Sequence, residues 1–259
     1  MLPWLQPNRL GRRARTVAEE ADDASNGWED LTTGLEVYRK ATEEHPDDAD
    51  LWFLYADALA TIEDWNRAET VARQGLTAAG FDQDLWVIAL EALCGQSLPD
   101  LVDRELDAPG HEDAHPLITP VYRARAAELS GDDGGVMSAL GSAYDEYGNV
   151  VNFARVPARP VLDLAVLLIR HGATQEADYI LDTFSRQADD LDVAWQAAAI
   201  GAALWQDTDL EITERYEERL GSDESRTNDE IDAAIQEAAE MIEPVANGNG
   251  DDSLSSGEG

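Results

Sequence analysis

Two histidines separated by three residues are the clearest candidate for chemistry in this sequence. His111, Glu112 and His115 match the pattern in which two histidines one helical turn apart bind zinc and the glutamate activates a water molecule. That pattern needs a long helix, whereas Pro109 and Pro116 leave room for barely one turn. A zinc-dependent hydrolase and an adventitious surface metal site are therefore alternatives, and we expect this segment to be a solvated connector.

The other side chains capable of catalysis fall outside any recognisable catalytic arrangement. His45 and His171 lie at the predicted C-terminal ends of helices, where a partial positive charge is favourable to the helix dipole. Cys94 lies in an apolar helical pattern, which is typical of a small core residue. The sequence shows no nucleophile elbow and no glycine-rich phosphate loop. We therefore expect a protein that is not an enzyme and that uses neither a cofactor nor a metal.

The chain is strongly acidic over its whole length of 259 residues. Its 54 Asp and Glu residues outnumber its 18 Lys and Arg residues, which gives a formal net charge of −36. Such a charge disfavours nucleic acid or an anionic membrane as a partner of the body of the protein. Two explanations stay open: a surface for a basic ligand, and adaptation to a salt-rich cytoplasm, as in halophilic archaea. The even spread of the acids favours the second.

Cysteine use and hydropathy indicate a cytoplasmic protein. Cys94 is a single cysteine and cannot form an internal disulfide, so a reducing compartment is expected. The sequence contains no run of about 18 apolar residues and begins without the continuous apolar region of a secretory signal. We therefore expect no membrane span.

The two ends of the chain differ from its body. Residues 1–16 hold four arginines and no acid, together with Trp4, Leu5 and Leu10. This basic arm could dock on a membrane, a nucleic acid or an acidic protein face, fold back onto the chain's own acidic surface, or be disordered. Residues 245–259 are predicted to form a disordered acidic tail, and residues 17–244 a folded domain.

Apolar residues recur at a spacing of 34 positions in residues 46–95. Trp52, Ala56 and Leu59 are followed 34 positions later by Trp86, Leu90 and Leu93. A fixed period of this length indicates a repeat architecture. The stretch resembles a tetratricopeptide repeat (TPR), and weaker matches extend the resemblance over about residues 28–206. The resemblance implies an all-α, TPR-like, right-handed solenoid of about five helical hairpins that binds other proteins.

Three segments outside the best repeats carry predictions of their own. A helix over about residues 13–23 would pair with the helix that ends at Glu44, unless that partner is missing. Residues 147–160 are interpreted as a connector with a seven-residue insertion. Residues 208–220 are predicted to form a helix charged nearly all round, which is typical of a solvated face.

The last predicted helix carries an apolar stripe that needs a partner. Thr227 and Asn228 supply its N-cap, and the stripe runs to Ile242. Apolar positions of the later hairpins, namely Leu162, Val166, Ile169 and Ile200, could bind a ligand helix or be covered by this C-terminal capping helix. We expect the capping helix to cover them, because its stripe needs a partner.

The resemblance to TPR proteins also implies a binding surface. In that family the first helix of each hairpin lines a concave groove, and the positions here would be Asp50, Phe53, Asp57, Asp84, Val87, Glu91 and Arg125. The family's chaperone adaptors hold a C-terminal carboxylate with Lys, Arg and Asn at such positions, whereas this groove is mainly acidic. A basic segment with one or two large apolar side chains is therefore the expected ligand, supplied by a partner or by the basic arm in cis or in trans.

Taken together, these patterns favour a non-enzymatic scaffold or adaptor that binds a protein segment in the concave groove. A structural subunit of a larger viral or cell-envelope assembly, with the basic arm inserted into a neighbour, is the alternative from another class. The zinc-dependent hydrolase is the remote alternative.

Overall fold

The described part of the chain is built from α-helices. A computed structural model describes residues 10–25, 31–150, 157–187, 191–206, 209–221 and 226–242, and no strand occurs among them. The predicted all-α class is therefore confirmed. Residues 1–9 of the basic arm and the predicted tail, 245–259, lie outside the described residues. None of the described helices has the length and apolar character needed to cross a membrane.

Thirteen helices follow one another along these residues. They are α1 (Arg12–Ser25), α2 (Leu31–Glu44), α3 (Ala49–Thr61), α4 (Trp65–Ala78), α5 (Gln83–Gly95), α6 (Pro99–Leu106), α7 (Ile118–Ser130), α8 (Asp133–Gly148), α9 (Ala158–Arg170), α10 (Thr174–Gln187), α11 (Leu191–Trp205), α12 (Leu210–Leu220) and α13 (Asn228–Ile242).

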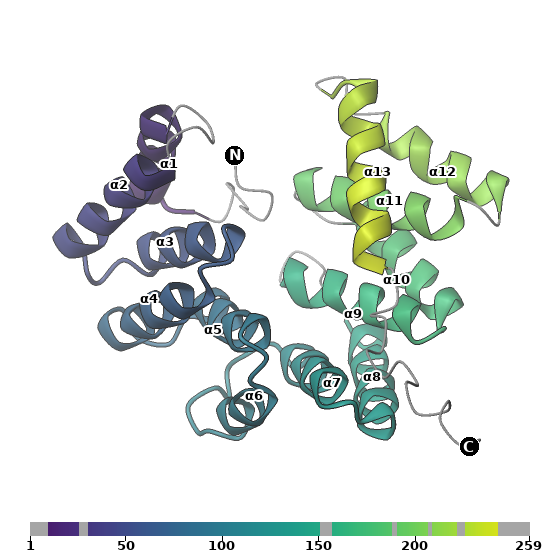
Figure 1. Ribbon diagram of the computed structural model, residues 1–259, viewed down its shortest axis with the longest axis horizontal. Helices are drawn as coiled ribbons and strands as arrows, with labels where there is room; N and C mark the ends of the chain where they lie inside the picture. Colours follow the sequence, from purple (N-terminus) through teal and green to yellow (C-terminus); the bar gives the residue numbers. More distant parts are fainter. Residues whose placement is uncertain are drawn as a thin grey trace, which may run out of the picture.

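Consecutive helices pack against each other in pairs, from α1 with α2 to α11 with α12, and α13 follows. Among the described residues this makes six pairs, one more than the sequence predicts, because α1 supplies the partner of α2. Helices α3, α5, α7, α9 and α11 also contact one another in that order. Figure 1 shows the resulting arc, which runs from α1 and α2 through α7 to α11 and α12.

Aspartate side chains begin four of the helices. In each case the carboxylate accepts a hydrogen bond from a backbone N–H three residues further on, over 3.0–3.4 Å. The four N-caps are Asp64 in α4, Asp82 in α5, Asp132 in α8 and Asp209 in α12. A carboxylate satisfies otherwise unpaired N–H groups and favours the positive end of the helix dipole, so part of the acid excess has a local structural role.

Helix α13 begins at a capping box, as Thr227 predicts. The Thr227 N–H donates to Glu230 Oε2 over 2.7 Å, and the Glu230 N–H donates to Thr227 Oγ1 over 3.3 Å. Helix α13 then packs against α9 and α11, with Ile235 and Ala238 buried in one apolar cluster with Leu162, Val166 and Ile200. The last helix therefore packs on α9 and α11, the two helices that carry the predicted positions.

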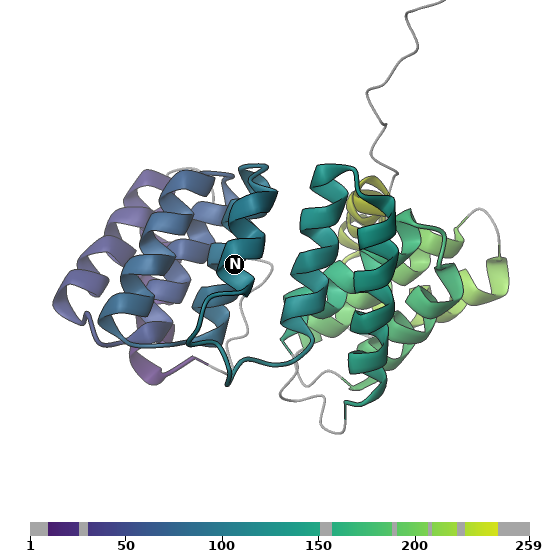
Figure 2. The same ribbon diagram turned by 90° about the horizontal axis from the view of Figure 1, so that it is seen from below.

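The buried apolar side chains form three clusters that succeed one another along the chain. The first spans α1 to α5, the second spans α5 to α7, and the third spans α7 to α13. Because α5 and α7 each belong to two clusters, the second cluster joins an N-terminal half, α1–α6, to a C-terminal half, α7–α13. Figure 2 shows these halves side by side.

Helix α12 is less solvated than its charges suggest. Thr213, Tyr216 and Leu220 are buried along one side of it, and the Tyr216 hydroxyl donates to Asp178 Oδ1 over 2.8 Å. Gly201 in α11 leaves room for this ring, since a Cβ there would lie 2.4 Å from it. The charges therefore mark the solvated face of α12, and three buried side chains at helical spacing dock its other side.

The two tryptophans of the repeat pattern pack to different degrees. Trp86 is buried at the centre of the second cluster, with 1% of its surface exposed. Trp52 is only partly buried, and its indole N–H donates to the Pro46 carbonyl over 2.9 Å. Its close neighbour is Gly75 of α4, where a Cβ would lie 2.6 Å from Trp52 Cβ. The close contact between α3 and α4 at this point therefore depends on glycine.

The burial of Trp86 leads to a test of the core. Truncating a buried aromatic side chain removes its transfer free energy and leaves a cavity, so Trp86→Ala should lower the free energy of unfolding by about 3–5 kcal/mol in urea denaturation. Met137, which is 52% exposed, provides the control, since Met137→Ala should change stability by about 0.5 kcal/mol or less. A loss below about 1 kcal/mol for Trp86→Ala would contradict the packing described here.

Candidate functional site

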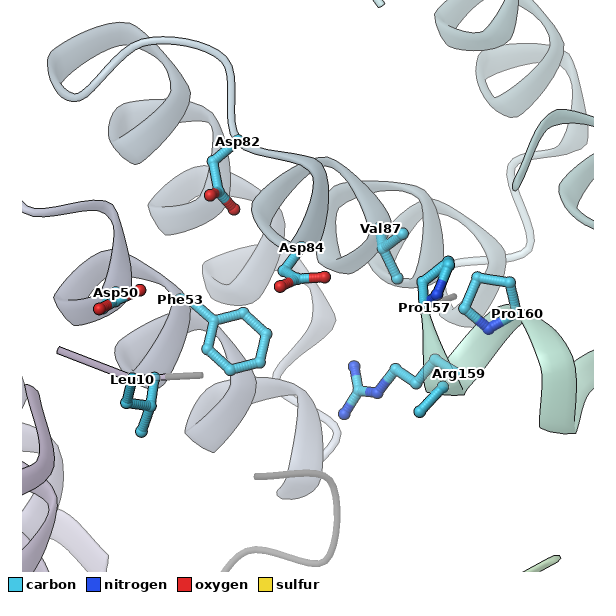
Figure 3. Close-up of a pocket in the computed structure, with 10 residues that line it drawn as sticks. Leu10, Asp50, Phe53, Asp82, Asp84, Val87, Pro157, Arg159 and Pro160 are labelled. Atoms are coloured by element: carbon cyan, nitrogen blue, oxygen red, sulfur yellow. The ribbon is translucent and has the colours of Figure 1, made fainter. Parts of the chain in front are cut away.

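A pocket of about 240 Å³ lies where α3, α5 and the start of α9 meet. Three aspartates line it, Asp50, Asp82 and Asp84, together with the apolar side chains of Leu10, Phe53 and Val87 and with residues 157–160. We call it the α3–α5 pocket. Figure 3 shows the ring of Phe53 between Leu10 and Val87, with the three carboxylates along one side and Arg159 opposite.

The spacing of 34 residues builds one wall of this pocket. Asp50 and Asp84 lie in the first turns of α3 and α5, and Phe53 and Val87 follow one turn later in each helix. Because α3 packs directly on α5, these equivalent positions come to lie side by side. Carboxylates in the first turn of a helix also favour the helix dipole. The pocket is thus an apolar floor edged by acids.

The first turn of α9 closes the other side of the pocket. Pro157 is the N-cap residue of α9 and has an extended backbone, with φ −66° and ψ 126°. Pro160 lies within the first turn, a position that tolerates proline because the first N–H groups of a helix have no intrahelical partner. The helix therefore starts inside the predicted connector 147–160, of which residues 151–156 lie outside the described residues.

The described end of the basic arm reaches the pocket in cis. Leu10 is 7% exposed, and the Gly11 N–H donates to Asp50 Oδ2 over 2.7 Å. Next along the chain, Arg13 pairs with Asp48 over 2.8 Å. Burial raises the pKa of Asp50, the Gly11 N–H opposes that rise, and the neighbouring Asp48 adds to it. Three links therefore hold residues 10–13 on the N-terminal end of α3.

Directly beside the pocket lies a group of five charged side chains, which we call the buried charge cluster. Its members are Asp57 of α3, Glu91 of α5, Arg125 of α7, and Arg159 and Asp163 of α9. Arg159 donates to Asp57 Oδ1 over 2.5 Å and also to Glu91 Oε2. Arg125 donates to Asp163 Oδ2 over 3.0 Å and lies 3.8 Å from Glu91.

Burial dominates the electrostatics of this cluster. The side chain of Asp57 is fully buried, and its second oxygen, Oδ2, has no hydrogen-bond partner among the described residues. Burial raises the pKa of Asp57, and Arg159 opposes that rise. Burial likewise raises the pKa of Glu91, to about 6, again opposed by Arg159. Three carboxyl groups therefore share two guanidinium groups, and water has more access to Arg125 and Asp163 than to Asp57 and Arg159.

The structure divides the seven predicted groove residues between two places. Four of them, Asp50, Phe53, Asp84 and Val87, line the α3–α5 pocket. The other three, Asp57, Glu91 and Arg125, lie in the buried charge cluster and bond to α9 of the same chain. The expectation that Asp57 and Glu91 stand on an open surface, ready for an arginine of a partner, therefore differs from the structure. Their arginine is Arg159.

Three charged residues of the site were missed from the sequence. Arg159 and Asp163 lie just after the connector, whose extra length interrupts the count of 34. Asp82 precedes α5 as an ordinary N-cap, so no pattern distinguishes it as a pocket residue. The signal that could have found Arg159 is electrostatic: buried acids on α3 and α5 require a cation from elsewhere in the chain.

The two histidines of the zinc-like pattern serve different parts of the fold. Residues 107–117 contain no helix, as the prolines predict. The His111 ring stacks on Trp86 at 4.3 Å, and its Nε2 lies 3.5 Å from Glu105. His115 Nδ1 instead accepts a hydrogen bond from the Leu117 N–H over 3.2 Å. Within the described ranges, no group of three or more His, Cys, Asp or Glu side chains could hold a metal ion.

The shared guanidinium of Arg159 can be tested by mutation. Arg159→Met should cost about 3–5 kcal/mol of unfolding free energy, because it leaves two buried carboxylates without their cation. Adding Asp57→Asn and Glu91→Gln should recover part of that loss, a coupling that urea denaturation of all variants would measure. Arg123→Met is the control: its ion pair with Asp107 is half-exposed and should be worth about 1 kcal/mol or less. Equal losses at the two arginines would contradict the cluster.

Glu91 gives stability a pH dependence of definite sign. Its pKa is about 6 in the folded protein and 4.5 ordinarily, so the folded state holds the proton more tightly. Its contribution to the free energy of unfolding is therefore greatest below pH 4.5 and falls as pH rises to about 6. We expect Glu91→Gln to remove this fall in urea titrations between about pH 4 and 7. Glu43→Gln, at a side chain 63% exposed, should leave it in place.

Comparison with known proteins found no relative of this chain. No family model matches the sequence, and no curated protein or solved structure matches it either. An assignment of function therefore depends on the α3–α5 pocket and the buried charge cluster beside it.

Proposed function

We propose that this protein is a non-enzymatic interaction scaffold that binds a segment of a partner protein in the α3–α5 pocket. The observation that carries the proposal is the pocket wall itself, where Asp50 and Asp84 flank Phe53 and Val87. An apolar floor edged by carboxylates suits a segment that is basic and inserts one large apolar side chain. Burying such a side chain contributes about 1.5–3 kcal/mol, and each partly exposed ion pair up to about 1 kcal/mol.

The proposed architecture is a TPR-like, right-handed solenoid of helical hairpins closed by α13. Two features support it. Helices α3, α5, α7, α9 and α11 contact one another in sequence, as the first helices of stacked hairpins do. Side chains 34 positions apart, such as Phe53 and Val87, line one wall. In such a stack, extended segments are bound on the surface that the first helices share.

The proposed setting is the cytoplasm of a salt-rich cell. Cys94 is buried, and burial raises the pKa of its thiol to about 11, so it behaves as an apolar core residue. The high net negative charge fits a protein that must stay soluble in concentrated salt. There the Debye length is roughly 3 Å, so recognition of a basic segment would depend on direct contact with the aspartates.

Binding of designed peptides tests this function. The probe is a fluorescent peptide with one tryptophan between two arginines in a glycine–serine background. Asp82→Asn with Asp84→Asn removes two charges from the pocket, while the amide introduced at the N-cap position of α5 can still cap the helix, so affinity should fall by about fivefold or more. Fluorescence anisotropy at low and at molar salt would measure this change.

A matched control variant has the same net charge as the variant with Asp82→Asn and Asp84→Asn. Asp132→Asn with Asp133→Asn alters the N-cap and first turn of α8 in the same way, outside the pocket. It should leave the affinity unchanged, whereas Phe53→Ala should weaken binding of the tryptophan peptide. If the α8 pair and the pocket pair weaken binding equally, general charge attraction explains the binding and the pocket is not the site.

A further inference from the structure

The path of the described chain begins at the pocket, at Leu10. Leu10 is itself a lining residue, and the hydrogen bond from Gly11 to Asp50 fixes the backbone at the pocket edge. Arg13 holds the following turn on Asp48. Residues 1–9 are therefore attached covalently to a residue that already lines the site.

These nine residues have the chemistry that the pocket suits. They comprise Met-Leu-Pro-Trp-Leu-Gln-Pro-Asn-Arg, with one cation, Arg9, and no acid. Trp4 and Leu5 offer large apolar side chains, and two prolines restrict the conformations that must be lost on binding. A pocket of about 240 Å³ has room for one or two such side chains rather than for the whole segment. The match is one of charge and of size.

The covalent link to Leu10 raises the effective concentration of residues 1–9 at the pocket, so even a weak intrinsic affinity would lead to binding. Nine residues span at most about 30 Å when fully extended, so they cannot move far from the pocket edge. A segment on so short a tether has an effective concentration in the millimolar range. Asp50 already accepts a hydrogen bond from the backbone that continues this segment, so the first contact has been made.

We propose that residues 1–9 occupy the α3–α5 pocket of their own chain and compete there with the partner segment. This proposal rests on the proposed function, because it uses the same pocket. It adds a regulatory consequence: a partner segment must displace Trp4 and Arg9 before it can bind, and any event that withdraws the first nine residues opens the site.

The test uses the full-length chain and a synthetic peptide with the sequence of residues 1–9. A full-length variant carrying Trp4→Ala, Leu5→Ala and Arg9→Gln should bind this peptide one to one in isothermal titration calorimetry. The wild-type chain should bind it at least about tenfold more weakly, because its own segment competes. Adding Asp82→Asn and Asp84→Asn to the variant should weaken binding again by about fivefold or more.

Each other outcome overturns a definite part of the proposal. If the variant and the wild type bind the peptide equally, the segment does not occupy the pocket in cis. If the wild type forms a dimer that the variant does not form, the segment binds in trans and the cis proposal fails. If the variant binds the tryptophan–arginine peptide but not residues 1–9, the proposed function stands and this inference is wrong; if it binds neither, both fail.

Discussion

The placement of Arg159 between two buried carboxylates fixes how the two halves of the protein meet. Its guanidinium group spans α3 and α5 through Asp57 and Glu91, while its own helix belongs to the C-terminal half. A planar fork of donors that must serve two fixed acceptors tolerates little displacement. The first turn of α9 is therefore held in one position, and with it Pro157 and Pro160, which form the far wall of the pocket.

This arrangement favours a defined geometry more than it favours stability. Removing Asp57, Glu91 and Arg159 largely from water is costly, and the cluster has three carboxyl groups for two guanidinium groups. Within the described part of the chain Asp57 Oδ2 has no hydrogen-bond donor, which adds to the cost. Apolar side chains of the same volume could join the helices at a lower cost in desolvation free energy. Because apolar contacts are not directional, they would let α9 shift along α3 and α5. The apolar contacts of the second cluster, around Trp86, stabilise the contact between the two halves. The ion pairs instead define the position of α9 relative to α3 and α5.

The sequence predicted what depends on local repetition and missed what depends on contacts across the stack. The spacing of 34 aligns Phe53 with Val87 because α3 and α5 pack side by side. It predicts core positions less evenly, since Trp86 is buried whereas Trp52 is only partly buried. It could not place Arg159, because the connector before α9 interrupts the register and no local pattern distinguishes a pairing arginine from a solvated one. Tyr216 was missed for a similar reason: its partner Asp178 lies 38 residues away on another helix.

The two walls of the pocket belong to different halves of the protein. The width of the pocket is therefore coupled to the angle between the N-terminal and C-terminal halves. Phe53 and Val87 belong to the N-terminal half, and residues 157–160 to the C-terminal half. The ends of the arc lie far from the pocket (Figure 1). A small increase in the distance between the two walls would therefore displace these ends by a larger distance. A side chain bound in the α3–α5 pocket would therefore influence the distance between α1 and α12, two helices that it does not contact.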